Sequence, residues 1–171
     1  IALEKDKKAD SMVFDLGTDG AGTPYLIQPN GGARLPSAPA ELFMDGTQVF
    51  VFTLKEVPKS ILSCLDHKRW GVSQLDYCIM HQANEMMLKR LGKKLGLSEA
   101  QMIISMQDIG NTSSASIPLA MTLSLSSQLL SKKNKLLLSG FGVGWSWGSV
   151  AYEQHELQLC RLVDLGEVKW N

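Results

Sequence analysis

An apolar run that passes directly into a helical pattern is the feature that most limits how this chain can fold. Residues 75–80 read LDYCIM, which has the length and composition of a buried strand. The next stretch, residues 82–95, carries apolar side chains at every fourth position and is followed by Gly96, so it predicts a helix with a glycine stop. A strand that leads straight into a helix is the repeating unit of layered α/β domains.

The rest of the chain alternates in the same way. A helix face begins at Thr47, and Pro58 is expected to kink or restart that helix. Residues 118–130 predict a further helix that is apolar on most of its faces and belongs between layers. The whole pattern predicts an α/β fold class. Short extended segments are expected at residues 1–3, 11–17, 23–28, 102–106, 136–139 and 149–152, and a surface loop at 29–39.

Composition excludes several classes of function. The 171 residues are 44% hydrophobic and 20% charged, enough for one core, and 17 basic side chains balance 17 acidic ones. This balance favours neither nucleic acid nor an anionic membrane as a partner, and residues 117–130 are too few and too polar to span a bilayer. Three cysteines without CxxC spacing argue against a disulfide framework or zinc site and fit a reducing, cytoplasmic setting. The chain begins without methionine or a signal peptide, so we expect it to be a piece of a longer protein.

Two polar residues stand where a predicted strand or extended segment gives way to a helix. His81 taken alone reads as a satisfied histidine at a strand end, and Asn111 taken alone reads as a turn or cap residue. Together they lie at the edge where α/β sheets gather ligand sites. Two neutral donors that converge there can hold a carbonyl oxygen as it gains negative charge.

A glycine-rich stretch, GFGVGWSWG from Gly140, is open to three interpretations. A dinucleotide fingerprint is disfavoured because the continuation alternates like a strand instead of opening a helix. A strand-loop-strand would let backbone N–H groups approach a ligand closely. The plain alternative is a tight hairpin in which Trp145 and Trp147 pack on the core.

Two charged stretches were weighed as further sites. The sequence HELQLC from His155 lacks a second histidine at the spacing of a metalloprotease motif, so no metal site is expected. Lys89, Arg90, Lys93 and Lys94 form a basic helix face. Such a face is either simply solvated or a dock for phosphate-bearing groups.

Three separated motifs carry a resemblance to a known family. HQAN from His81, GNTSSASIPLA from Gly110 and GFGVGWSWG from Gly140 together resemble the C-terminal half of β-ketoacyl-acyl-carrier-protein synthase III, a thiolase-like condensing enzyme. The resemblance extends to GTDGAG, PNGGARLP and MDGTQVFVFTLK, so residues 1–153 are interpreted as that domain and 154–171 as an unassigned extension. It implies one βαβαβαββ half of a five-layered body.

The resemblance also implies a chemistry for the complete enzyme. An acyl group moves from coenzyme A to a cysteine, and a malonyl-carrier thioester then loses carbon dioxide and attacks it. His81 and Asn111 match the family's histidine and asparagine, which hydrogen-bond the enolate oxygen. The resemblance implies no cofactor, because the coenzyme A thioester is a substrate. The expected partners are acyl-CoA, malonyl-acyl carrier protein, the missing N-terminal half and a second copy in a homodimer.

Other positions take their roles from the same resemblance. Phe141, Gly142, Val143 and Gly144 would form the active-site loop, with the Val143 N–H in an oxyanion hole, which requires a negative φ at that valine. Gly46, Phe50 and Asn84 would line the pantetheine channel. The family's usual basic residue is replaced by Met86, so Lys89, Arg90 or Lys93 would dock the carrier instead.

The family uses a cysteine, a histidine and an asparagine in catalysis, and the cysteine nucleophile is the one that this sequence does not match. The family cysteine belongs to the first half, and Cys64, Cys78 and Cys160 do not share its context. We therefore expect the isolated chain to be inactive. Two alternatives stay open: acyl transfer without decarboxylation, and a non-catalytic interaction domain that retains the fold.

Overall fold

A computed structural model describes residues 9–33, 35–37 and 39–162. The strand expected at residues 1–3 lies outside this range. The described chain contains β1 (Val13–Thr18), η1 (Gly20–Tyr25), β2 (Leu26–Ile27), β3 (Phe43–Met44), α1 (Gly46–Lys68), η2 (Val72–Gln74), β4 (Tyr77–Met80), α2 (Glu85–Leu95), η3 (Ser113–Ala115), α3 (Ser116–Ser131), β5 (Asn134–Gly142) and β6 (Ser146–Gln154).

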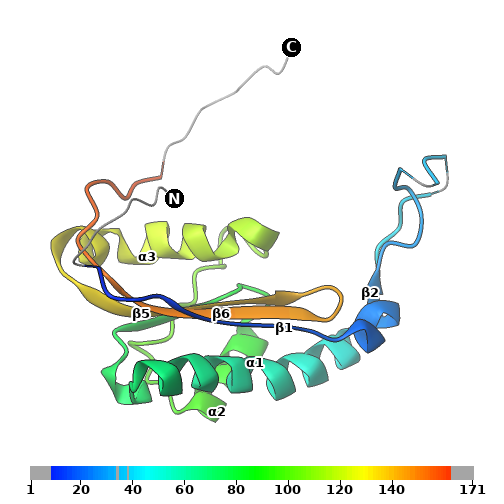
Figure 1. The fold of residues 1–171 in the computed structure, drawn as a ribbon. Helices are drawn as coiled ribbons and strands as arrows, with labels where there is room; N and C mark the ends of the chain where they lie inside the picture. The colour runs from blue at the N-terminus through cyan, green and yellow to red at the C-terminus, as the bar shows by residue number, and fades with distance from the viewer. Residues whose placement is uncertain (1–8, 34, 38, 163–171) are drawn as a thin grey trace.

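A four-stranded mixed sheet forms the middle layer. Its order is β1-β6-β5-β4, with β4 parallel to β5 and the other pairs antiparallel. Helices α1 and α2 cover one face and α3 covers part of the other (Figure 1). The predicted α/β class is therefore confirmed.

The short strand β4 is apolar throughout because it is covered on both faces. Cys78 and Met80 belong to the core against α1 and α2, whereas Ile79 belongs to the core against α3, and all three side chains are fully buried. Side chains alternate between the faces of a strand, so a strand between two helical layers needs no polar positions. Burial on both faces thus explains why the run LDYCIM is mostly apolar.

Pro58 lies inside one continuous helix, so the expected restart there is wrong. A proline has no N–H and leaves the carbonyl four residues earlier without its helical partner. That carbonyl belongs to Leu54, and it accepts a hydrogen bond of 2.7 Å from Lys94 Nζ on α2. A side chain from the neighbouring helix thus replaces the missing intrahelical bond.

Two segments that were expected to be extended contain little β-strand. Within residues 23–28 only β2 is extended, because Asp19 caps η1 by accepting a hydrogen bond from Ala21 N at 3.0 Å. Residues 102–106 form a single bridge, between Met102 and Cys78. The side chain of Gln82 supplies hydrogen bonds that a neighbouring strand would otherwise make there, as described below.

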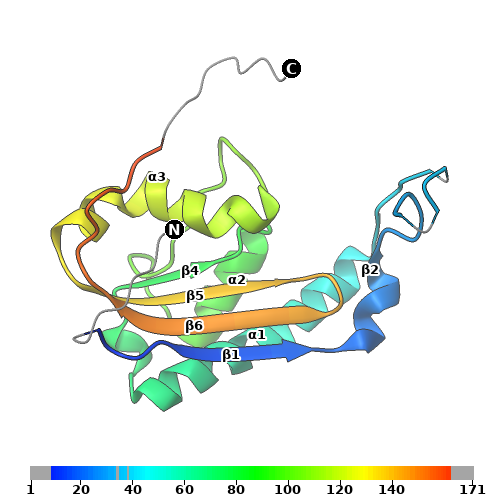
Figure 2. The same cartoon turned by 45° about the horizontal axis from the view of Figure 1, so that its top comes forward.

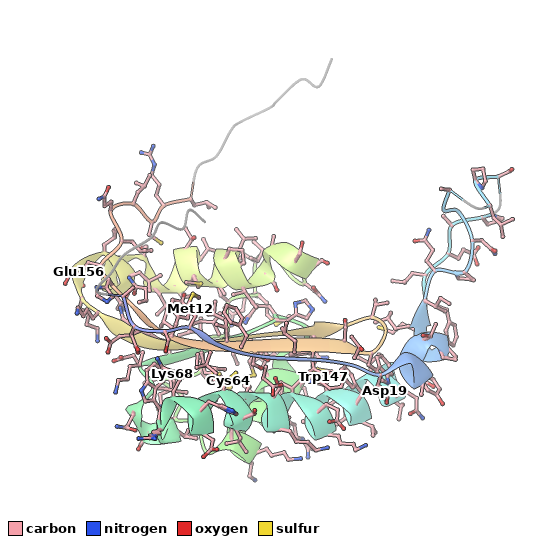
Figure 3. All side chains as sticks on the ribbon, in the orientation of Figure 1. Met12, Asp19, Cys64, Lys68, Trp147 and Glu156 are labelled. Carbon is pink, nitrogen blue, oxygen red and sulfur yellow. The ribbon has the colours of Figure 1, made fainter. Side chains whose placement is uncertain are left out.

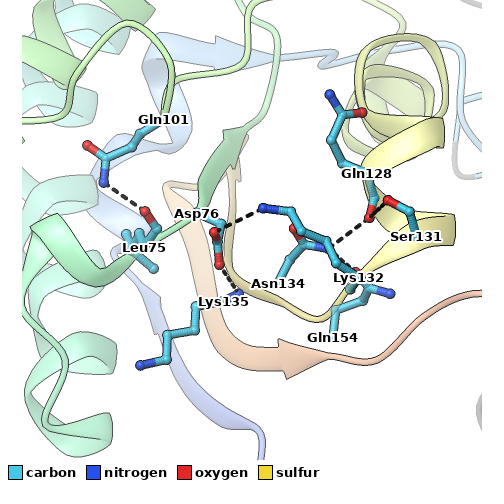
Figure 4. Close-up of polar contacts among 9 residues, drawn as sticks. All are labelled: Leu75, Asp76, Gln101, Gln128, Ser131, Lys132, Asn134, Lys135 and Gln154. Atoms are coloured by element: carbon cyan, nitrogen blue, oxygen red, sulfur yellow. Dashed lines mark hydrogen bonds and ion pairs between the residues drawn. The ribbon is translucent and has the colours of Figure 1, made fainter.

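Asn134 closes the connection from α3 into the sheet. This buried residue begins β5, and its Nδ2 donates to the carbonyls of Gln128 (3.2 Å) and Lys132 (2.8 Å) and to Oε1 of Gln154 (2.9 Å) (Figure 4). Asp76 holds the same end of β5 by accepting from Lys135 N at 2.8 Å. Gln154 belongs to this buried network and ends β6, which is longer at both ends than the extended segment expected at 149–152.

On the side of the sheet that α1 covers, polar contacts tie the helix to the strands. Cys64 lies between α1 and the sheet (Figure 3), and its Sγ donates to the carbonyl of Ser149 at 3.4 Å. The hydroxyl of Ser60 donates to Ser149 Oγ at 2.9 Å, which donates in turn to Ser139 Oγ at 2.9 Å.

Over the described residues, no helix has the length and apolar character needed to cross a membrane.

Candidate active site

The carboxyl ends of the parallel strands β4 and β5 bring the first two site residues together. His81 follows β4 directly, and its backbone N–H donates to the Ser139 carbonyl of β5 at 2.8 Å. Phe141 lies two residues farther along β5, and its ring meets the imidazole edge-on with centroids 5.5 Å apart. The aromatic ring thus fixes one side of the half-buried imidazole.

The turn that carries Asn111 reaches the same histidine. Ser116, at the start of α3, places its Oγ 2.7 Å from Nδ1 of His81. Asn111 lies five residues earlier and accepts a hydrogen bond from Ser113 N through Oδ1 at 2.9 Å. This bond occupies the oxygen of the carboxamide, which leaves Nδ2 as the donating end of an exposed side chain.

Burial favours the neutral form of the His81 imidazole. Burial lowers the pKa of His81 from its ordinary value of 6.5, and the backbone of Ser113 opposes this with a smaller upward effect. Burial penalises the charged form of any histidine that lacks a carboxylate partner. A neutral imidazole has a single N–H, so the position of that proton decides what the ring can do.

Gln82 and Ser116 are two residues of the site that sequence reasoning missed. Gln82 is buried and donates through Nε2 to the carbonyls of Met80 (2.7 Å) and Ile103 (3.2 Å), while its Oε1 accepts from Ser105 N at 2.8 Å. It thereby pins the segment that leads to Asn111 against β4. A glutamine directly after the histidine was the available signal for this role.

The glycine-rich stretch is a β-hairpin that joins β5 to β6. Both the strand-loop-strand and the packing of Trp145 are confirmed: this indole is buried and stacks on Phe52 with ring centroids 4.6 Å apart. Gly144 has φ of 133°, a conformation that favours glycine. Among the described non-glycine residues only Arg69 and Ser113 have positive φ, so Val143 keeps the negative φ that its branched side chain requires.

The residues assigned to the pantetheine channel lie at helix starts and against the core. Gly46 is exposed at the first position of α1, and Phe50 packs against the same core cluster as Phe141. Asn84 is the N-cap of α2, because its Oδ1 accepts from Met87 N at 2.8 Å. Its oxygen is therefore structural, and its exposed amide nitrogen is the part that can reach a ligand.

The basic face of α2 borders a hollow of about 630 Å³. Lys89, Arg90 and Lys93 line it together with Glu85 and Met86. Lys89 pairs with Glu85, which raises the pKa of the Lys89 ammonium. Lys94, expected on the same face, is instead turned to α1 and caps the Leu54 carbonyl.

Cys64 and Cys78 are buried thiols. Burial raises the pKa of Cys78 to about 12 and also raises that of Cys64. Cys160 is half-buried and packs against the core cluster to which α3 contributes. Within the described ranges, no three histidine, cysteine or acidic side chains are grouped to hold a metal ion.

Comparison with known proteins identifies the family of the chain. The family profile for the 3-oxoacyl-[acyl-carrier-protein] synthase III C terminal matches residues 65–154, more than half of the chain. The β-ketoacyl-[acyl-carrier-protein] synthase III of Streptococcus pneumoniae (strain Hungary19A-6) is 34% identical over 157 residues, which are 88% of this chain and 48% of the relative. The chain therefore spans about half the length of the curated relatives it matches.

Two solved structures show the same fold. The 3-oxoacyl-(acyl-carrier protein) synthase of Burkholderia xenovorans LB400 superposes with a TM-score of 0.82 at 39% identity, covering 88% of this chain and 46% of that one. The synthase III of Pseudomonas aeruginosa PAO1 gives a TM-score of 0.79 at 30% identity, covering 91% and 48%. The chain thus has a thiolase-like fold and belongs to the 3-oxoacyl-[acyl-carrier-protein] synthase III family, of which it represents the C-terminal part.

Proposed function

We propose that this chain is the enolate-stabilising half of an enzyme that condenses an acyl-CoA with malonyl-acyl carrier protein. The observation that supports the proposal is the 2.7 Å contact of His81 Nδ1 with Ser116 Oγ, since Ser116 lies five residues after Asn111. The relatives whose names specify this class of synthase support the choice of substrates. A cytoplasmic setting and a homodimeric complete enzyme belong to the same proposal.

In the proposed reaction the acyl group first moves from coenzyme A to a cysteine of the other half. The malonyl thioester then loses carbon dioxide, and the electron pair of the broken C–C bond moves onto the thioester carbonyl to form an enolate. His81 and Asn111 donate hydrogen bonds to this oxygen. Each preorganised donor of this kind is typically worth about 3 to 4 kcal/mol.

The enolate carbon then attacks the acyl-cysteine carbonyl. The negative charge moves to that second oxygen, for which we propose the backbone N–H of Val143 as a donor. Collapse of the intermediate expels the cysteine thiolate and leaves a 3-oxoacyl thioester. Coenzyme A and carrier thioesters are substrates in this scheme, and no cofactor takes part.

An uncovered apolar face supports a further half as the structural partner. Phe14 and Leu16 on β1 are 59% and 77% exposed, on the face of the sheet opposite α1. Figure 2 shows that α3 lies along β4 and β5 and leaves β1 bare on this face. Leu123 and Leu130 on α3 are exposed as well. Large apolar surface of this kind marks an interface.

Single-residue variants of the full-length protein test the assignment. In His81→Ala and Asn111→Ala we expect release of labelled carbon dioxide from malonyl thioester to fall about 10²- to 10³-fold. Self-acylation by acyl-CoA should be largely intact, because that step forms no enolate. Lys133→Ala, an exposed change between α3 and β5, is the control. Unchanged carbon dioxide release in both variants would refute the assignment.

The alternative of acyl transfer without decarboxylation draws on Met86, an apolar side chain in the otherwise charged hollow of α2. It predicts normal self-acylation and transfer to an acceptor, with no labelled carbon dioxide from the unaltered enzyme. A full-length protein without a cysteine at the expected position would favour the non-catalytic alternative. The isolated 171-residue chain should turn over no substrate in either case.

A further inference from the structure

The position of the single ring proton of His81 is a consequence of how the buried serine of α3 is hydrogen-bonded. This inference rests on the proposed function, in which an N–H of the His81 ring must face the substrate oxygen. Nδ1 faces Ser116, with its Oγ 2.7 Å away, so Nε2 is the nitrogen left for substrate. A proton on Nδ1 would leave Nε2 able to accept but not to donate.

The hydroxyl of Ser116 has two hydrogen-bonding partners among the described residues. Its Oγ lies 3.3 Å from the backbone nitrogen of Gln82 and 2.7 Å from Nδ1 of His81. Ser116 itself is 2% exposed. A buried hydroxyl therefore has these two groups with which to satisfy one donor and two acceptor positions.

The Gln82 N–H can only donate, so it uses one acceptor position of Oγ. If Nδ1–H also donated to Oγ, the hydroxyl proton would have no acceptor among these contacts. An unsatisfied buried donor is costly. If the hydroxyl donates to Nδ1, the hydroxyl proton and the Gln82 N–H both have acceptors. The remaining ring proton then lies on Nε2.

We propose that Ser116 is a positioning residue, whose hydroxyl donates to Nδ1 of His81 and so holds the imidazole in the Nε2–H tautomer. Ser116 does not touch the substrate in this scheme and acts only through His81. Gln82 assists through its backbone N–H, which orients the hydroxyl. The connection from β4 into α2 and the start of α3 thus fix both the orientation of the His81 ring and the nitrogen that carries its proton.

The backbone of Ser113 is the competing group. It lies close enough to His81 to raise its pKa, as a carbonyl does when it accepts from a ring N–H. A carbonyl cannot donate, so it can only stabilise a protonated nitrogen. Loss of the Ser116 hydroxyl removes the one group that requires Nδ1 to be bare, and we expect the Nδ1–H tautomer to become populated.

Nitrogen NMR of the imidazole in the full-length protein tests this directly. With ¹⁵N-labelled histidine, at a pH where His81 is neutral, the unaltered protein should show a pyridine-type Nδ1 and a pyrrole-type Nε2. Ser116→Ala should give shifts that indicate a tautomer mixture, and Ser116→Thr, which retains a hydroxyl, should restore the original pattern. Ser124→Ala removes an exposed hydroxyl from the same helix and is the control.

The kinetic arm uses the same variants. We expect Ser116→Ala to lower decarboxylation about 10- to 100-fold with little change in KM, because only part of one donor's contribution is lost. A pyrrole-type Nδ1 in the unaltered protein would overturn the inference, and this measurement does not depend on any variant folding. Slower decarboxylation with an unchanged tautomer in Ser116→Ala would also overturn it. Unchanged decarboxylation in His81→Ala would instead defeat the proposed function.

Discussion

At the scale of single residues, hydrogen bonds within the chain determine which end of each carboxamide in the site is free to bind a ligand. The Oδ1 of Asn111 is occupied by the Ser113 N–H, and Asn84 uses its Oδ1 to cap α2. In both carboxamides the nitrogen end is left to donate. Free amide donors of this kind suit the binding of an oxyanion and not of a cation.

Gly22 shows how closely the hairpin is packed against η1. A Cβ at this glycine would lie 2.2 Å from the indole of Trp145, whereas a Cβ at Gly20, two residues earlier, would meet nothing within 4 Å. We expect Gly22→Ala to displace Trp145 from Phe52 and to lower the free energy of unfolding by about 1 to 3 kcal/mol. Urea unfolding followed by tryptophan fluorescence measures the change. Gly20→Ala is the matched control, and an equal effect in both variants would contradict the packing argument.

At the scale of secondary-structure elements, α2 has two faces with separate duties. Its inner face supplies Leu88 and Leu91 to the core, and its outer face presents Lys89, Arg90 and Lys93 around the hollow. Phosphate groups and acidic carrier surfaces are attracted to such a basic face. The N-cap of the same helix, Asn84, lies three residues after His81, which places any docked carrier near the proposed reaction site.

Charge reversal on this face tests the docking role. We expect the double variant Arg90→Glu and Lys93→Glu to raise KM for malonyl-acyl carrier protein about tenfold or more, with kcat nearly unchanged, because rim charges act mainly on association. The effect should shrink at high salt. Lys55→Glu and Lys59→Glu on α1 provide a control of equal charge. Equal KM values in the two double variants would argue against docking at α2.

How far the sequence predicts these elements depends on how local their causes are. The step from β4 into α2 is encoded within twenty residues, so the positions of His81 and Asn84 follow from the pattern and the resemblance. The bond from Lys94 to Leu54 and the contact of Gly22 with Trp145 join residues far apart in the chain. No local pattern reports such pairs, which is why the continuous helix through Pro58 was not predicted. Ser116 was overlooked for the same reason, since it lies 35 residues from the histidine that it contacts.

At the scale of the whole molecule, the described chain has one well-covered side and one bare side. Helices α1 and α2 cover one face of the sheet, and α3 covers only the part near β4 and β5 (Figures 1 and 2). The strands β2 and β3 and the loop between them project away from this body. The chain spans about half the length of its curated relatives, and the bare side is where we propose that the other half packs.

The bare apolar side has a consequence for the chain produced alone. We expect the 171-residue chain to self-associate, and the double variant Phe14→Thr and Leu16→Thr to sediment closer to a monomer, because exposed apolar surface is removed from β1. Val51→Thr, at an exposed position on α1, is the control. Sedimentation of the unaltered chain as a monomer at high concentration would contradict this expectation.

The claim on which the proposed function rests is that His81 and Asn111 act on one oxygen. A double-mutant cycle on decarboxylation by the full-length protein tests it most directly, with labelled carbon dioxide as the readout. If the two donors act as a unit, His81→Ala combined with Asn111→Ala should lose far less than the product of the two single losses. Losses that multiply fully would show that the two side chains act independently, and would contradict a shared enolate oxygen.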